Sequence, residues 1–234
     1  MAGPGRNRSK EMNLKRTADH GRRATEAEHV PPASSAVSLR FGRRSALWLL
    51  AAAPAACASP NPSLYTLAVV PGRVLPSPPR RIELRQIDLA RYLERSQIVR
   101  SSEGLRLDVS GNDWWGEPLD AMLSRVLVQA LSQRLPTSMV FAENSAISAQ
   151  PDLSVELNVQ RFDADRSGAL VLQAQVAVTN AATATRDLRY AVPLRSAGTP
   201  GLVDAMSRAS GELADSIAQM IAAEATRTGR HRLQ

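Results

Sequence analysis

Residues 152–162, Asp-Leu-Ser-Val-Glu-Leu-Asn-Val-Gln-Arg-Phe, alternate polar and apolar side chains from Asp152 to Gln160. The segments 169–179 and 187–194 repeat the same period of two. This period puts the apolar side chains on one face of a strand, so each segment predicts a half-buried strand. Polar stretches at 163–168 and 180–186 predict the turns between them. The three strands therefore form an antiparallel meander.

Two segments have the helical period instead. The first begins after Pro118 and ends at Pro136, since proline suits a first turn and cannot continue a helix. The second begins at Thr199-Pro200 and runs to about Thr226. The apolar stripes that we expect to face the core are Leu119, Met122, Leu123, Val126, Leu127, Ala130 and Leu131 in the first helix, and Leu202, Met206, Ala209, Leu213, Ile217, Met220 and Ile221 in the second.

The chain before the first helix predicts shorter strands. A strand at 64–70 is followed by a proline-rich loop, a second strand at 81–87 and a hairpin of 97–100 with 105–109. A short strand at 138–142 follows the helix. Seven or eight strands and two amphipathic helices predict an α+β fold, in which a mixed, largely antiparallel sheet packs against two long amphipathic helices in a layered sandwich. We expect a single domain at 64–228 and a frayed tail at 229–234.

Upstream of this domain, residues 43–56 have the order of a secretory signal peptide. Two arginines precede a short apolar run that ends in small residues before Cys57. Pro54 stops the run far short of the roughly 20 residues that span a bilayer. Residues 1–42 show no apolar period. We interpret them as disordered, or as a leader that is not translated because the start codon is assigned too far upstream.

Pro54-Ala55-Ala56-Cys57 resembles a bacterial lipobox, with Pro54 where leucine is usual. Cys57 is then the predicted lipidation site, carrying a covalent diacylglycerol and an N-acyl chain, and 57–63 is a lipidated tether. The alternative is an ordinary signal peptide that leaves Cys57 as a free thiol.

Charge and histidine content exclude several functions. The first 56 residues have a net charge of +6 and the remainder +1, so the excess of basic residues lies mostly in the leader. This distribution argues against a nucleic-acid partner. The histidines are His20, His29 and His231, so the predicted body of the domain has no imidazole for a metal site or a Ser-His-Asp triad. We predict no enzyme activity, no catalytic residue, no metal and no other cofactor.

Two motifs carry a family resemblance. Tyr92-Leu-Glu-Arg-Ser-Gln-Ile-Val99 is followed by Trp115-Gly-Glu-Pro-Leu119 at the helix start. With the opening Leu64-Tyr-Thr-Leu67, these segments resemble the auxiliary lipoprotein family of ABC-type transport systems, the paraquat-inducible-type lipoproteins that accompany mammalian-cell-entry (MCE) proteins. Ala90 departs from the family, which often has proline there.

The resemblance implies a mixed sheet packed with helices and a non-catalytic, lipid-anchored accessory component. Its implied partners are an MCE-domain protein with its permease and ATPase, and its implied place is the periplasmic face of the outer membrane, which Ala58 after the cysteine also suits. It would help lipids pass between the inner and outer membranes. A homo-oligomer, packed as a ring around a tunnel, is a further expectation.

Several residues outside the motifs allow competing interpretations. Trp114 and Trp115, after an expected turn at Asn112-Asp113, are candidates for partner binding or for covering the core. Ser110-Gly-Asn is similar to a segment of some lipases, so an esterase remains a minor alternative. An envelope-assembly lipoprotein with a protein or peptidoglycan partner is the other.

Asp163 and Asp165 could hold calcium, but turn aspartates that face solvent are the simpler interpretation.

Overall fold

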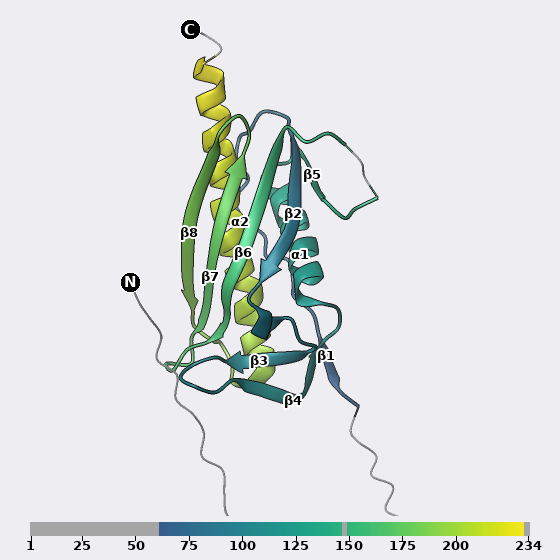
Figure 1. The fold of residues 1–234 in the computed structure, drawn as a ribbon, viewed down its shortest axis with the longest axis vertical. Helices are drawn as coiled ribbons and strands as arrows, with labels where there is room; N and C mark the ends of the chain where they lie inside the picture. Colours follow the sequence, from purple (N-terminus) through teal and green to yellow (C-terminus); the bar gives the residue numbers. More distant parts are fainter. Residues whose placement is uncertain (1–60, 147–148, 232–234) are drawn as a thin grey trace, which may run out of the picture. The chain divides into compact units, whose positions relative to one another are not determined.

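The computed structural model describes residues 61–146 and 149–231, and both long helices lie on one face of the sheet (Figure 1). Cys57 and the predicted signal peptide lie outside these residues. The elements are β1 (Ser63–Tyr65), β2 (Arg81–Leu89), the short 3-10 helix η1 (Arg91–Leu93), β3 (Gln97–Ser101), β4 (Asp108–Trp115), α1 (Leu119–Arg134), β5 (Met139–Ala142), β6 (Leu153–Ala164), β7 (Leu170–Thr179), β8 (Thr183–Val192) and α2 (Gly198–His231).

The sheet is mixed, as predicted. Its strands lie in the order β1-β4-β3-β6-β2-β5, and β7 and β8 extend it from β6. The strands β6, β7 and β8 pair antiparallel in chain order, which confirms the meander. β2 pairs parallel with both β5 and β6. A parallel pair needs a crossover, and α1 lies in the connection between β2 and β5.

The core lies between the sheet and the helices. Along β6, Leu153, Val155, Leu157 and Val159 are buried, while the alternate residues Glu156 and Asn158 face solvent. All fourteen apolar residues predicted to face inward from the two helices are at most 4% exposed. The described helices include none that is long and apolar enough to cross a bilayer. The α+β prediction is thus confirmed for a single domain.

The first strand is shorter than predicted. β1 ends at Tyr65, whereas the sequence indicated a strand to residue 70. The amides beyond Tyr65 bond to the helices instead of to a strand: Leu67 N–H donates to Met122 Sδ (3.0 Å) and Ala68 N–H to Ser207 Oγ (3.0 Å). The segment therefore lies against α1 and α2, and Leu67 is buried there although it is not in a strand.

The β3–β4 hairpin was displaced in the prediction. Its second strand is Asp108–Trp115 and not 105–109, and the predicted turn at Asn112-Asp113 lies inside it. β4 pairs with β3 on one side and with β1 on the other, where Asp113 lies opposite Ser63 and the Asn112 side chain donates to Asn61 O. Pairing with the distant β1 therefore outweighs their local preference for turns.

Both predicted turns of the meander are shorter than expected. β6 continues through Asp163 to Ala164, and β8 begins at Thr183. Leu194, which we expected in the last strand, follows β8 and packs against the core. In each hairpin the backbone pairing of the strands extends into residues of types that are common in turns. The opposite strand supplies their hydrogen-bond partners.

Candidate partner-docking site

The three segments that carry the family resemblance meet at one place. β1 pairs parallel with β4, so that Tyr65 lies beside Trp115. Trp115 N–H donates to Ser96 O (2.7 Å), and Gly116 N–H donates to Tyr65 O (2.9 Å). These backbone bonds join segments that are far apart in sequence. The motifs therefore describe one structural unit.

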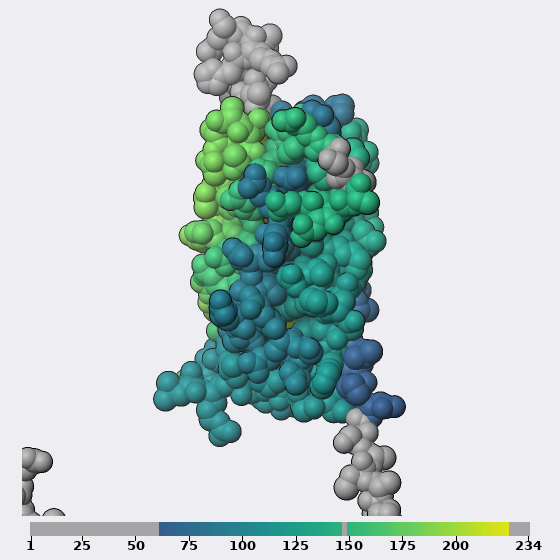
Figure 2. All heavy atoms as spheres, turned by 45° about the vertical axis from the view of Figure 1, so that its right-hand side comes forward, coloured from purple at the N-terminus to yellow at the C-terminus, as the bar shows by residue number. Residues whose placement is uncertain are grey.

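A hollow of about 510 Å³ opens beside this junction. It is lined by the end of β2, by Glu94–Ser96 and by Trp115–Asp120, so both longer motifs contribute to its wall. Figure 2 shows the part of the chain that holds β2 and η1 lying beside α1 on this side of the molecule. A smaller hollow of about 250 Å³ shares Gln86, Ile87 and Asp120 with it. We call the larger one the motif hollow.

The motif hollow has an excess of negative charge, because four carboxylates and one arginine, Arg95, line it. Asp88, Glu94 and Asp120 line it and form no ion pair within the described part of the chain. Glu117 differs, because Arg125 Nη2 donates to its Oε1 (2.6 Å) and so neutralises it. The hollow thus offers carboxylates to a basic or hydrogen-bonding group of a partner.

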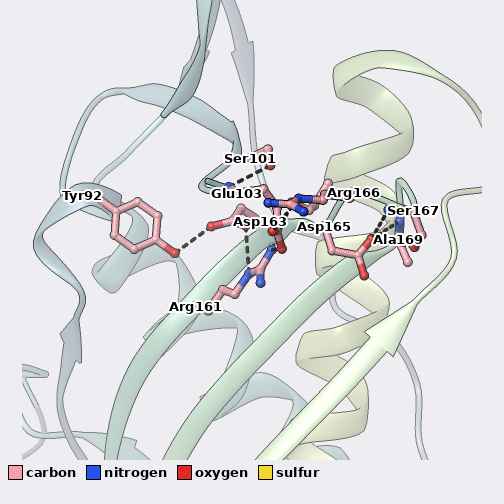
Figure 3. Close-up of polar contacts among 10 residues, drawn as sticks. Tyr92, Ser101, Glu103, Arg161, Asp163, Asp165, Arg166, Ser167 and Ala169 are labelled. Atoms are coloured by element: carbon pink, nitrogen blue, oxygen red, sulfur yellow. Dashed lines mark hydrogen bonds and ion pairs between the residues drawn. The ribbon is translucent and has the colours of Figure 1, made fainter. Parts of the chain in front are cut away.

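A buried polar cluster holds the Tyr92 motif against β6 (Figure 3). Asp163 is fully buried, and its two carboxylate oxygens accept from Tyr92 Oη (2.7 Å) and from Arg161 Nε (3.0 Å). Arg161 Nη2 also donates to Glu103 Oε1 (2.8 Å) in the β3–β4 loop. We call Tyr92, Glu103, Arg161 and Asp163 the Asp163 cluster. It ties η1 and the β3–β4 loop to the meander.

Comparison with protein families gives a match over residues 65–218 to the ABC-type transport auxiliary lipoprotein component. The match includes both longer motifs and the Asp163 cluster.

The chain belongs to this family.

Known relatives agree with the assignment. Over 136 residues the chain is 29% identical to the intermembrane transport lipoprotein PqiC of Escherichia coli K12. The aligned region covers 56% of this chain and 68% of PqiC. PqiC of Shigella flexneri matches equally well. Family membership makes this chain an auxiliary lipoprotein of a transport system.

Solved structures share the fold. An uncharacterized protein superposes with a TM-score of 0.60 at 20% identity, covering 69% of this chain and 99% of that one. A protein from Xanthomonas campestris gives 0.58 at 17% identity, with coverages of 74% and 99%. At these identities the likeness concerns the fold alone.

The two tryptophans have different surroundings in this auxiliary lipoprotein. Trp115 is 6% exposed and belongs to the core, although it also lines the motif hollow. Trp114 is half-buried, and its indole Nε1 has no hydrogen-bond partner among the described residues. Partner binding by either tryptophan stays a prediction.

Ser110 has structural partners that the sequence did not reveal. Its Oγ donates to Asp113 Oδ2 (2.8 Å) and accepts from Asp113 N–H (3.2 Å). Thr199 Oγ1 donates to the same carboxylate oxygen, and these two hydroxyls hold the pKa of Asp113 below its usual range. Asp113 therefore links β4 to the start of α2. A nucleophilic Ser110 is not needed to explain this arrangement.

The two aspartates considered as calcium ligands point toward different partners (Figure 3). Asp163 faces Tyr92 and Arg161 inside the strand, so its interpretation as a solvated turn residue was wrong. Asp165 does lie in the turn, where its Oδ1 accepts from the backbone and hydroxyl of Ser167. The burial of Asp163 depends on Tyr92 and Arg161, and only Tyr92 belonged to a recognised motif.

Tyr92 makes the stability of the domain depend on pH in the alkaline range. Burial, with the hydrogen bond to Asp163, raises the pKa of Tyr92 from 10.0 to about 12. Between these pH values an unfolded Tyr92 loses its proton while the folded one keeps it, so stability falls as pH rises through this window. We expect Tyr92→Phe to reduce this fall, measured by urea unfolding on either side of pH 10.

A residual fall is expected in Tyr92→Phe, since burial also raises the pKa of Tyr190. An identical pH profile in the variant and the parent would contradict the assignment to Tyr92.

Proposed function

We propose that this protein is a lipid-anchored accessory component of an MCE-type ABC transport system that moves lipids between the inner and outer membranes. Membership in the auxiliary lipoprotein family and similarity to an intermembrane transport lipoprotein support the proposal. The observation that carries it is the convergence of the three family segments around the acidic motif hollow. The backbone bonds of the junction hold the wall of the hollow in one shape, as a docking surface requires.

In this proposal the partner is an MCE-domain protein that operates with its permease and ATPase. Basic side chains of the partner enter the motif hollow and pair with Asp88, Glu94 and Asp120. Because these carboxylates are near the surface, their attraction acts mainly on the rate of association and is weakened by salt. Glu117 is already paired with Arg125, so it shapes the wall of the hollow.

The anchor is Cys57, four residues before the first described residue. In the mature protein it carries a diacylglycerol thioether and an N-acyl chain, which hold the domain on the periplasmic face of the outer membrane. Several acyl chains are needed, because a single chain gives only marginal attachment.

Intact mass spectrometry of the membrane-extracted protein tests the anchor. We expect the mass of residues 57–234 plus one diacylglycerol and one acyl chain. A chain that begins elsewhere, or one that begins at Cys57 with an unmodified thiol, would contradict lipidation.

Charge reversal in the motif hollow tests the docking surface. Glu94 is exposed, and we expect Glu94→Arg to weaken co-purification with the MCE-domain protein by about tenfold, or about 1.4 kcal/mol, since the reversal removes one charge pair and sets a like charge against the partner's basic group. The matched control is Glu212→Arg on an exposed position of α2. Equal co-purification by both variants would contradict docking at the hollow. Recovery of peptidoglycan or an outer-membrane protein alone would favour an envelope-assembly role.

A further inference from the structure

The loop between β3 and β4 presents two leucines to solvent. Leu105 is 104% exposed and Leu107 is 41% exposed, with Arg106 between them. Gly104, at a φ of 79°, turns the backbone just before this triplet. Single exposed leucines are common on protein surfaces, but two at a protruding turn mark a site of apolar contact. We call Leu105, Arg106 and Leu107 the hairpin tip.

Ion pairs at the base of the hairpin balance its charges. Arg100 Nη2 donates to Asp108 Oδ1 (2.6 Å) across the two strands. Glu103 is held by Arg161 of the Asp163 cluster (2.8 Å). Arg106 has no ion-pair or hydrogen-bond partner in residues 61–146 and 149–231. The hairpin thus offers two apolar side chains and one unpaired cation above a base that is held by ion pairs.

The hairpin tip lies at the end of the domain from which the tether leaves. Figure 1 shows β1 and the β3–β4 hairpin at the same end. Asn112 Nδ2 donates to Asn61 O (3.2 Å), so the tether joins the domain beside β4. From Cys57 to Asn61 the chain spans at most about 14 Å. From Asn112 back to Leu107 is five steps along the chain and to Leu105 seven, at most about 17 and 23 Å. The tip and the anchor need not be adjacent to share one membrane, because Figure 1 shows β3 and β4 running across this end of the domain.

We propose that the hairpin tip inserts into the headgroup layer of the membrane that holds Cys57. Leu105 and Leu107 contact the upper acyl chains, and Arg106 meets lipid phosphates, as arginine does when it places its charge at an interface. The anchor supplies a high effective concentration, so two leucines suffice where they could not recruit a free protein. This inference rests on the proposed lipidation of Cys57. It would fix the domain's orientation on the membrane.

The test uses the full mature lipoprotein in vesicles of phosphatidylethanolamine with a minority of phosphatidylglycerol. A thiol-reactive, environment-sensitive fluorophore is attached to Leu105→Cys, because a lipidated Cys57 cannot react. The matched control is Met139→Cys, a 44% exposed apolar residue that begins β5 at the other end of the domain (Figure 1). At Leu105 we expect a blue-shifted emission and quenching by aqueous iodide severalfold weaker than at Met139.

Equal iodide quenching at the two positions would overturn the inference while leaving the anchor intact. The parent protein separates the two failures: if it takes up label at Cys57 or does not float with the vesicles, the anchor fails and the inference with it. Protection of Leu105 that requires the MCE-domain protein would assign the hairpin tip to a protein surface and overturn membrane insertion.

Discussion

Replacement of Arg134 by alanine is expected to lower the free energy of unfolding by about 3 kcal/mol. Arg134 ends α1, and its side chain is fully buried. Its Nε donates to Asp215 Oδ1 (2.6 Å), and its Nη atoms donate to the carbonyls of Val70 (3.3 Å), Ala130 (3.1 Å) and Gly211 (3.0 Å). One guanidinium thus joins α1, α2 and the segment after β1.

The cost comes from lost donors and a cavity more than from the ion pair alone. Asp215 is 41% exposed and can be hydrated after the substitution, which puts the effect at the low end of the range of about 3–5 kcal/mol for broken buried pairs. The neighbouring carbonyls cannot all be hydrated in this way. Gly72 packs directly against the Arg134 guanidinium, since a Cβ at this position would overlap it.

Urea unfolding followed by circular dichroism measures this effect. Arg125→Ala is the matched control on the same helix, because the Arg125 side chain is 43% exposed and its pair with Glu117 should contribute less than about 1 kcal/mol. Equal losses in the two variants would contradict the structural role of Arg134.

The second large effect is expected for Asp163→Ala, at about 3 kcal/mol. The substitution leaves Tyr92 Oη without its acceptor and removes one of the two carboxylates that compensate Arg161. Arg161 is only 19% exposed, so water replaces the lost carboxylate poorly. The same urea experiment applies, with Asp108→Ala as control, because the Asp108 side chain is 55% exposed.

A double-mutant cycle with Tyr92→Phe distinguishes the cluster from general damage to the strand. We expect a coupling energy of about 1 kcal/mol or more between Tyr92 and Asp163, since one buried hydrogen bond to a charged group contributes that much. Additive losses would mean that the Tyr92 motif is held to β6 by other contacts.

The layers of the fold could be predicted because their signals are local. Alternation along 152–162 and the stripe from Leu119 to Leu131 each report which face is buried, and both predictions are confirmed. The end of α1 at Arg134, directly before Leu135 and Pro136, also follows from the chain itself.

Two of the incorrect predictions, the length of the first strand and the exposure of Asp163, involve partners that are distant in sequence, and so does the burial of Arg134. Nothing near Leu67 indicates that its amide would bond to Met122 Sδ instead of to a strand. Aspartate is common in turns, and the burial of Asp163 is favourable because Tyr92 and Arg161 donate hydrogen bonds to it. Arg134 has the polarity of a surface residue, but its acceptors lie on α2 and in the segment after β1.

The candidate site was half predicted. The motifs around Tyr92 and Trp115 were identified by resemblance, but their meeting at one hollow depends on the pairing of β1 and β3 with β4. The carboxylates of Asp88 and Asp120 belong to neither motif, and only the fold brings them to the same wall as Glu94.

Site-specific photocrosslinking in cells tests the proposed docking most directly. A photoreactive amino acid at Glu94 should capture the MCE-domain protein encoded with the transporter, and the same group at Glu212 on α2 should not. Capture at Glu212 but not at Glu94, or of no MCE-domain protein from either position, would contradict the role of the motif hollow.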